Sequence, residues 1–216
     1  MADTAEAGST LRRTVTIPPV GLQADLRLPP DPRGVILFAH GSGSGRLSRR
    51  NREVAAQLND LGIATVLMDL LTEQDAADGR TVFDIPLLAE RLPQADLWIA
   101  SEPELADLPF GLFGASTGAG AALLAVAELG SRISAVVSRG GQPDLAGPRL
   151  SEVTAPTLLI VGSDDRKVVD LNRRALAELP GAKLLRRVPG PATSSIGRAS
   201  RRPLPGWRVT GASMIW

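Results

Sequence analysis

Cysteine is absent from this chain of 216 residues. Its absence excludes disulfide bonds, thiolate metal sites and a cysteine nucleophile. No apolar run reaches the roughly 18 to 20 residues that a membrane-spanning helix requires. Residues 1–10 hold acidic and small side chains but no hydrophobic signal core, so we expect no secretion and a cytoplasmic location.

Acidic residues are missing from the last part of the chain. No aspartate or glutamate follows Glu178, whereas seven basic side chains do, although the whole chain has a net charge of only +1. A basic tail can bind nucleic acid or another acidic surface. Here arginines and aromatic residues are not interleaved and no binding motif accompanies them, so we expect no nucleic-acid partner.

Apolar runs typical of buried strands alternate with helical patterns along most of the chain. Strands are expected at 12–17, 22–28, 34–39, 63–71, 110–114, 133–138, 156–162 and 183–188. Helices are expected at 49–61, 82–100, 116–129 and 168–179. The alternation predicts an α/β fold with a mostly parallel central sheet and helices on both faces, in which the first two strands form a hairpin.

The composition divides the chain into three parts. Residues 1–11 are expected to be a flexible N-terminus, and residues 12–190 form one α/β domain. The basic tail, residues 191–216, has neither a helical nor a strand period. Because a sheet of this kind should close with a packed helix, we expect that C-terminal helix to be missing or replaced by an irregular tail.

The strongest motif is Gly-x-Ser-x-Gly, with Ser116 at its centre. A bare five-residue match occurs by chance in glycine-rich proteins, but here an apolar strand precedes it and a small-residue helix follows it. That context is typical of the nucleophile elbow of an α/β-hydrolase fold. We therefore predict that Ser116 is a nucleophile and that the backbone N–H of Thr117 faces a developing oxyanion.

A glycine- and serine-rich loop, residues 40–45, follows the expected strand 34–39. Its place suits the second oxyanion donor of a hydrolase, with the amides of Gly41 and Ser42 as candidates. A phosphate-binding loop is the rival interpretation, but the segment lacks both the Walker lysine and the Gly-x-Gly-x-x-Gly spacing. We expect His40 to orient this loop by hydrogen bonds, with a role as catalytic base as the alternative.

An acidic turn follows the apolar run 156–162. In the order nucleophile, acid, histidine, Asp165 is the candidate acid and Asp164 its close competitor. The alternative is that both residues only cap the next helix.

Four arginines follow the glycine loop, at positions 46, 49, 50 and 52. The plain interpretation is a solvated helix face. The alternative is that one of them orients an anionic substrate through a bidentate contact.

Taken in order, these motifs resemble the dienelactone-hydrolase-like branch of the α/β-hydrolases over about residues 12–190. The matching segments are 38–44, 49–51, 68–72, 114–118 and 161–165. The resemblance implies a mechanism with Ser116, Asp165 and a histidine, acting on an ester or lactone without a metal or cofactor. Site walls are expected from residues 72–81, a polar surface loop, and from residues 141–148.

The chain departs from that family in two ways. Dienelactone hydrolases use a cysteine nucleophile, which this chain lacks. Family members continue from the last strand through Val-Pro-Gly-Ala-x-His into a closing helix, whereas this chain reads Val-Pro-Gly-Pro-Ala-Thr at 188–193 and its one histidine is His40. We interpret the tail as a frame-shifted reading of the gene, since a GCC codon at Ala192 before any threonine codon contains CAC, a histidine codon.

These patterns together predict a serine hydrolase of small-molecule esters or lactones that is impaired because its triad histidine is absent. The alternative is a non-catalytic protein of the same fold that binds a small molecule or a protein partner. No membrane partner is expected, and the sequence indicates no particular oligomeric state.

Overall fold

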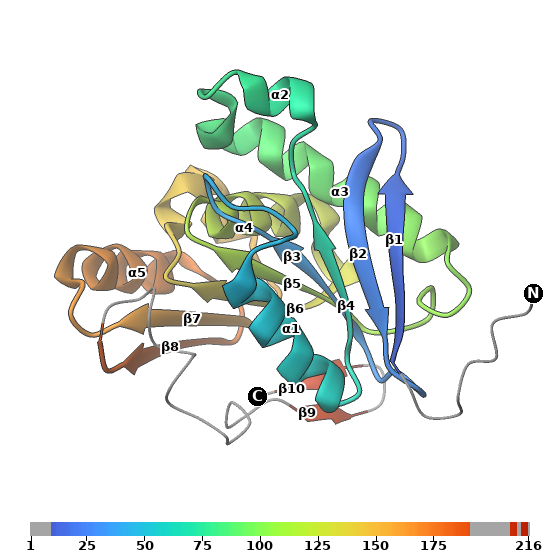
Figure 1. Ribbon diagram of the computed structural model, residues 1–216. Helices are drawn as coiled ribbons and strands as arrows, with labels where there is room; N and C mark the ends of the chain where they lie inside the picture. The colour runs from blue at the N-terminus through green and yellow to red at the C-terminus, as the bar shows by residue number, and fades with distance from the viewer. Residues whose placement is uncertain (1–9, 191–207, 211–212, 216) are drawn as a thin grey trace, which may run out of the picture.

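The computed structural model describes residues 10–190, 208–210 and 213–215. At its centre is an eight-stranded sheet in the order β1-β2-β4-β3-β5-β6-β7-β8 (Figure 1). Its strands are β1 (Leu11–Ile17), β2 (Leu22–Leu28), β3 (Val35–Ala39), β4 (Ala64–Met68), β5 (Phe110–Ala115), β6 (Ile133–Arg139), β7 (Thr157–Gly162) and β8 (Lys183–Val188). β1 and β2 form an antiparallel hairpin and β2 is antiparallel to β4, whereas all other neighbours are parallel. The expected mostly parallel sheet is confirmed.

The central strands are buried on both faces. Every residue of β3, β4, β5 and β7 is buried, which explains their continuous apolar sequences. Because β3 to β8 run in parallel, the loops that follow them meet at one edge of the sheet, called here the carboxyl edge. In open α/β sheets this is the edge at which ligands bind.

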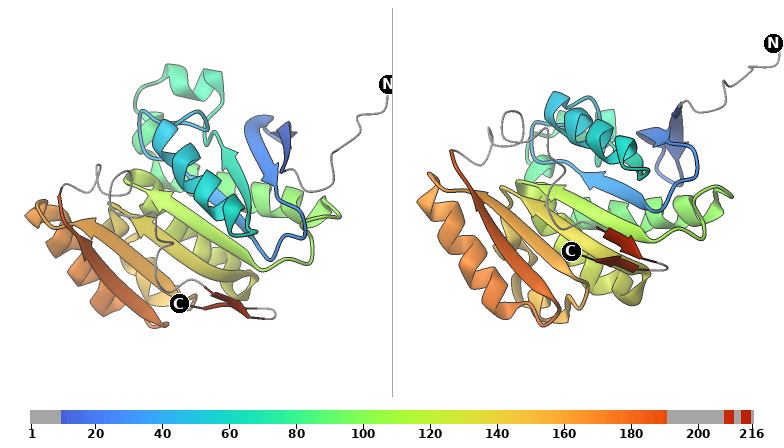
Figure 2. Two further views of the ribbon diagram at one scale, coloured as in Figure 1. Left: turned by 60° about the horizontal axis from the view of Figure 1, so that its bottom comes forward. Right: turned by 90° about the horizontal axis from the view of Figure 1, so that it is seen from below.

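Helices cover both faces of the sheet, as the sequence predicts (Figure 2). On one face α1 (Arg49–Asp60) packs Val54, Ala55 and Leu58 against β3, β4 and β5. The opposite face is covered by α3 (Ile85–Ser101), α4 (Thr117–Leu129) and α5 (Arg166–Glu178). Short 3₁₀ segments η1 (Thr81–Phe83), η2 (Gly130–Arg132) and η3 (Pro143–Glu152) connect these elements.

The expected polar loop at 72–81 is wrong in part, because it contains the helix α2 (Glu73–Ala77). Thr72 caps this helix: its hydroxyl accepts from the backbone N–H of Asp75 at 3.0 Å. The Asp75 carboxylate in turn accepts from the backbone N–H of Thr72 at 3.1 Å. This reciprocal capping box gives the short helix its start, and the Thr-x-x-Asp spacing was its sequence signal.

Within the tail that was expected to be irregular the structure describes two short strands, and residues 191–207, 211–212 and 216, where a closing helix was expected to be missing, lie outside the described residues. β9 (Arg208–Thr210) and β10 (Ser213–Ile215) pair antiparallel as a separate two-stranded sheet. Three-residue strands are too short to show a period, so the pattern analysis missed them. Within the described residues, no helix combines the length and apolar character needed to cross a membrane.

Candidate active site

Ser116 lies at a sharp bend between β5 and α4 at the carboxyl edge. Its φ of 52° and ψ of −126° are strained for a residue with a side chain. The flanking glycines make the bend possible: a Cβ on Gly114 would lie 2.5 Å from the Cα of Ala119, and a Cβ on Gly118 would overlap two backbone carbonyls at the end of β3. Ser116 precedes the helix but its side chain makes no capping hydrogen bond, so its hydroxyl is not used to cap α4.

The structure brings the glycine loop against Ser116. A Cβ on Gly41 would lie 2.7 Å from the Cβ of Ser116 and 3.4 Å from its Oγ. The backbone N–H of Ser42 donates to the hydroxyl of Thr117 at 2.9 Å. Ser42 is therefore engaged with the helix start. Within residues 10–190 the N–H groups of Gly41 and Thr117 have no hydrogen-bond acceptor, which leaves them as candidate oxyanion donors.

His40 is buried and both of its ring nitrogens are engaged. Its Nε2 accepts from the backbone N–H of Leu70 at 3.0 Å, so the proton is on Nδ1, which donates to the Gly41 carbonyl at 3.0 Å. Burial lowers the pKa of this imidazole, although the Gly41 carbonyl and the charge of Asp69 oppose the shift. The ring thus ties the glycine loop to the segment after β4 and has no free nitrogen for the proton of Ser116.

Ion pairs fix the far end of the same loop. Asp69 accepts from the backbone N–H of Arg46 at 2.7 Å and from its guanidinium at 3.2 Å. Asp25 pairs with Arg52 at 3.1 Å and lies 3.6 Å from Arg46. Two of the four arginines expected on a solvated helix face are therefore ion-paired: Arg46 holds the end of the loop against Asp69, and Arg52 links α1 to β2.

The two candidate acids follow β7 at the carboxyl edge, two strands from β5. Asp165 is the N-cap of α5, and its Oδ1 accepts from the backbone N–H of Val168 at 3.1 Å. Asp164 is exposed, and no hydrogen bond joins either carboxylate to Ser116 within residues 10–190. The bond that Asp165 makes is therefore a helix cap, as the alternative interpretation held. Its second carboxylate oxygen has no hydrogen-bond partner within residues 10–190.

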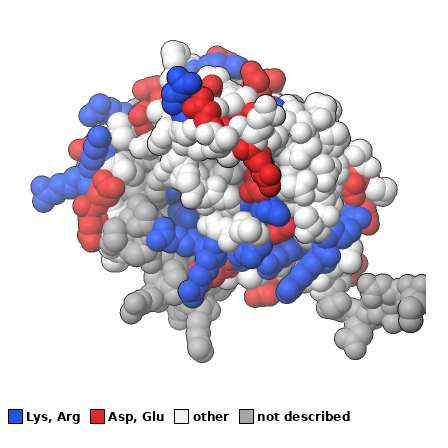
Figure 3. Space-filling view, turned by 45° about the horizontal axis from the view of Figure 1, so that its top comes forward, with Lys and Arg blue, Asp and Glu red and all other residues white. Residues whose placement is uncertain are grey.

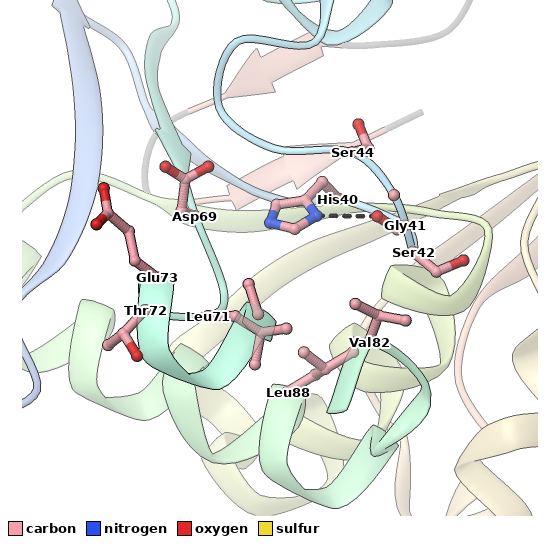
Figure 4. Close-up of a pocket in the computed structure, with 12 residues that line it drawn as sticks. His40, Gly41, Ser42, Ser44, Asp69, Leu71, Thr72, Glu73, Val82 and Leu88 are labelled. Carbon is pink, nitrogen blue, oxygen red and sulfur yellow. Dashed lines mark hydrogen bonds between the residues drawn. The ribbon is translucent and has the colours of Figure 1, made fainter. Parts of the chain in front are cut away.

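A cavity of about 390 Å³ opens beside the glycine loop (Figure 4). Ser116 does not line it, but Gly41, which contacts Ser116, does. The loop, the end of β4, α2 and the start of α3 supply its walls: His40, Gly41, Ser42, Gly43, Ser44, Asp69, Leu71, Thr72, Glu73, Ala76, Val82 and Leu88. The expected wall at 72–81 is therefore present, whereas residues 141–148 do not line this cavity.

The cavity has a polar side and an apolar side. Figure 4 shows the backbone and hydroxyl groups of the glycine loop across from Leu71, Val82 and Leu88. Glu73 and Asp69 lie at one end, and Asp69 is paired with Arg46. The space therefore suits a small group of mixed polarity.

Three residues with no site role assigned from the sequence shape the elbow, although one of them, Gln142, lies in the expected wall at 141–148. The carbonyl of Arg139 accepts from the backbone N–H of Ser116 at 3.4 Å, and the N–H of Gln142 donates to the Ser116 carbonyl at 3.2 Å. The buried amide of Asn172 donates to the carbonyl of Gly141 at 2.9 Å, which holds the segment between the other two. Arg139 and Gln142 meet the elbow because β6 neighbours β5 in the sheet, whereas Asn172 comes from α5, and no sequence motif marks any of the three.

His40 is the one histidine of the chain, and both of its ring nitrogens are engaged, so no histidine among the described residues has a nitrogen free to accept the proton of Ser116. Residues 192 and 193, where the family pattern would place it, lie outside the part of the chain that the structure describes.

Comparison with known sequences gives relatives from two strains of Mycobacterium tuberculosis that carry the same description. No protein-family model matches the chain. A Mycobacterium tuberculosis (strain H37Rv) protein, named provisionally as a phosphoribosyl transferase, is 55% identical over 172 residues. The match covers 80% of this chain but 39% of that protein, so the chain spans about two fifths of the relative's length.

Comparison with solved structures is more extensive. A dienelactone hydrolase from Anabaena variabilis ATCC 29413 is 45% identical, with a TM-score of 0.82, covering 89% of this chain and 92% of that one. The esterase Est1E from Butyrivibrio proteoclasticus has a TM-score of 0.67 at 14% identity, covering 82% and 88% of the two chains. The second similarity concerns the fold alone, whereas the first extends to sequence over nearly the whole of both chains.

Proposed function

This chain belongs to the dienelactone hydrolase family of α/β-hydrolases, and on that premise we propose that it is a serine hydrolase of small-molecule esters or lactones. In the proposed reaction the Oγ of Ser116 attacks the substrate carbonyl carbon. The resulting oxyanion is stabilised by the N–H groups of Thr117 and Gly41. As the C–O bond of the ester breaks, the Ser116 proton passes by way of water to the leaving alkoxide, which gives the alcohol and the acyl-enzyme. A further water molecule then hydrolyses the acyl-enzyme to the acid and restores the serine hydroxyl.

One observation carries the proposal: Ser116 is held at a strained bend in contact with Gly41. Strain at a single non-glycine residue persists only where the surrounding structure enforces it, and it concentrates at active sites. The neighbouring N–H groups without acceptors supply what a tetrahedral intermediate needs.

We further propose that turnover is slow. A serine hydroxyl is a weak nucleophile without an adjacent base, and both nitrogens of His40 are engaged. Oxyanion donors and binding alone still accelerate such a reaction about 10³- to 10⁴-fold over water. Asp165 would orient a histidine that this chain does not supply.

The lack of a free histidine favours one other function. In this alternative the chain is not a catalyst, and it binds a small molecule in the cavity beside the glycine loop or a protein partner over the surface around that cavity. Phosphoribosyl transfer, the activity in the name of the longer relatives, is not part of the proposal for this chain, because its fold is that of hydrolases. A cytoplasmic location stays a prediction from the sequence.

Hydrolysis of p-nitrophenyl acetate tests the proposal. We expect slow release of p-nitrophenol that the variant Ser116→Ala loses. Equal rates for both proteins would remove Ser116 from the reaction and favour the binding function. A fast, Ser116-dependent rate would contradict the proposed impairment alone.

A further inference from the structure

Arg139 is the last residue of β6 and lies next to the elbow. It pairs with Ala115 across the two parallel strands, and its carbonyl accepts from the N–H of Ser116. Its side chain shares the α1 face of the sheet with Phe113, whose ring centroid lies 5.8 Å from the guanidinium carbon. The arginine therefore places a positive charge on the α1 face at the carboxyl edge, and its backbone is hydrogen-bonded to that of the proposed nucleophile.

This charge has no carboxylate partner among the described residues. Its one polar contact there is a bond from a guanidinium nitrogen to the Oδ1 of Asn51, at 3.3 Å. Arg46 and Arg52, by contrast, both pair with aspartates. Residues 191–216, most of which lie outside the described part, contain no aspartate or glutamate, so the acidic side chains outside the described part are Asp3 and Glu6.

A second positive charge lies near the first, because Arg50 directly precedes Asn51 on α1 and Asn51 accepts the hydrogen bond from Arg139. Burial, and then the charge of Arg50 on α1, lower the pKa of the Arg139 guanidinium. Arg50 is exposed, so its side chain is free to follow a ligand. Because a partly buried cation beside a like charge is costly, an anion between the two would lower the energy of both.

We propose that Arg139 and Arg50, together with the amide nitrogen of Asn51, bind a phosphate group of the ligand beside Ser116. Two cations match the charge of about −1.5 to −2 that a phosphate monoester carries, better than the single charge of a carboxylate. Asn51 uses its Oδ1 on Arg139, which leaves its nitrogen as a donor. Figure 3 shows lysine and arginine side chains gathered in a band across the face of the molecule in view. The assignment names the ligand class for the site of the proposed function and rests on it.

Calorimetric titration of the full chain with phenyl phosphate and with benzoate tests this site. We expect phenyl phosphate to bind about tenfold more tightly than benzoate. Arg139→Gln should weaken phosphate binding about tenfold or more, and Arg50→Gln about threefold. The matched control is Arg49→Gln, which should leave the affinity unchanged. Arg49 directly precedes Arg50 on α1, its side chain is 92% exposed, and it pairs with Glu53.

The assignment would be overturned if the unaltered chain bound no phenyl phosphate, or if the Arg139 and Arg50 variants bound it as tightly as the unaltered chain. Tighter binding of benzoate would also overturn the phosphate class. If Arg139→Gln fails to fold, as circular dichroism would reveal, the exposed substitution Arg50→Glu replaces it and should abolish binding. Fluorophosphonate labelling of Ser116 in the same samples separates the two proposals, since retained labelling without phosphate binding contradicts the phosphate site alone.

Discussion

A Cβ atom on Gly41 would lie 2.7 Å from the Cβ of Ser116, so the backbone of the loop after β3 packs directly on the elbow. This contact puts a backbone N–H near the serine hydroxyl without any intervening side chain. It also explains why the first residue after His40 has no side chain.

The variant Gly41→Ala should therefore disturb both stability and reactivity. The new methyl group must displace the elbow, and overpacking of this kind costs about 1–3 kcal/mol of unfolding free energy. Denaturant unfolding measures that cost, and the release of p-nitrophenol should fall with it. Gly79→Ala is the matched control, because a Cβ there meets no atom within 4 Å. A Gly41→Ala protein as stable and as reactive as the control would argue against the contact.

The single histidine makes a specific pH dependence testable. His40 has a lowered pKa in the folded protein, while in the unfolded chain its pKa is near the ordinary value of about 6.5. As the pH falls below about 6.5, the unfolded chain binds a proton more readily than the folded one, so the free energy of unfolding decreases. Protonation of the folded state would also break the bond from the N–H of Leu70.

Thermal unfolding between pH 5 and pH 8 measures this effect. Stability should decline on the acidic side for the unaltered chain, and that decline should shrink in His40→Gln, which keeps an acceptor for Leu70. Because no other histidine is present, an unchanged pH profile in the variant would show that His40 does not carry the dependence.

Restoring the missing base should raise the rate. We predict that Ala192→His or Thr193→His increases p-nitrophenyl acetate hydrolysis about 10²-fold, the typical contribution of a general base. The added Ser116→Ala change should abolish the gain. Both positions lie outside the described residues, so failure at both would count against the lost-histidine hypothesis. The frameshift hypothesis has its own test, because a gene sequence near codon 189 that yields no histidine on any single-base repair would contradict it.

Asp165 can be tested in its two roles separately. In the chain as it stands, Asp165→Asn should change neither stability nor rate, because asparagine caps helices as well as aspartate does. Asp165→Ala should lose the bond to Val168 and cost about 1 kcal/mol of unfolding free energy. In a protein with the base restored, Asp165→Asn should slow hydrolysis while Asp164→Asn should not. Equal effects of the two substitutions there would remove Asp165 as the orienting acid.

Much of the fold could be predicted because its strong signals are local. The runs that form β3 and β5 are apolar throughout, and the elbow motif falls between a strand and a helix. The capping box of α2 was equally local, but the helix has no buried residue, so the segment 72–81 showed no apolar pattern to indicate a helix. The strands β9 and β10 are too short to carry a period.

The parts of the site that escaped prediction depend on contacts between distant segments. The engagement of the Ser42 amide depends on a hydroxyl 75 positions later, on Thr117. Arg139 reaches the elbow because β6 follows β5 in the sheet order, which the sequence does not state. The pairing of Arg46 with Asp69 likewise joins two loops, so neither interpretation of the arginines from the sequence, a solvated face or a contact to an anionic substrate, included it.

Mass spectrometry after treatment with a fluorophosphonate tests the central claim, that Ser116 is a nucleophile beside oxyanion donors, most directly. We predict a slowly formed covalent adduct on Ser116, located by fragmentation of the tryptic peptide 92–132 and absent in Ser116→Ala. Long exposure that leaves Ser116 unmodified, or an adduct confined to another serine, would contradict the account.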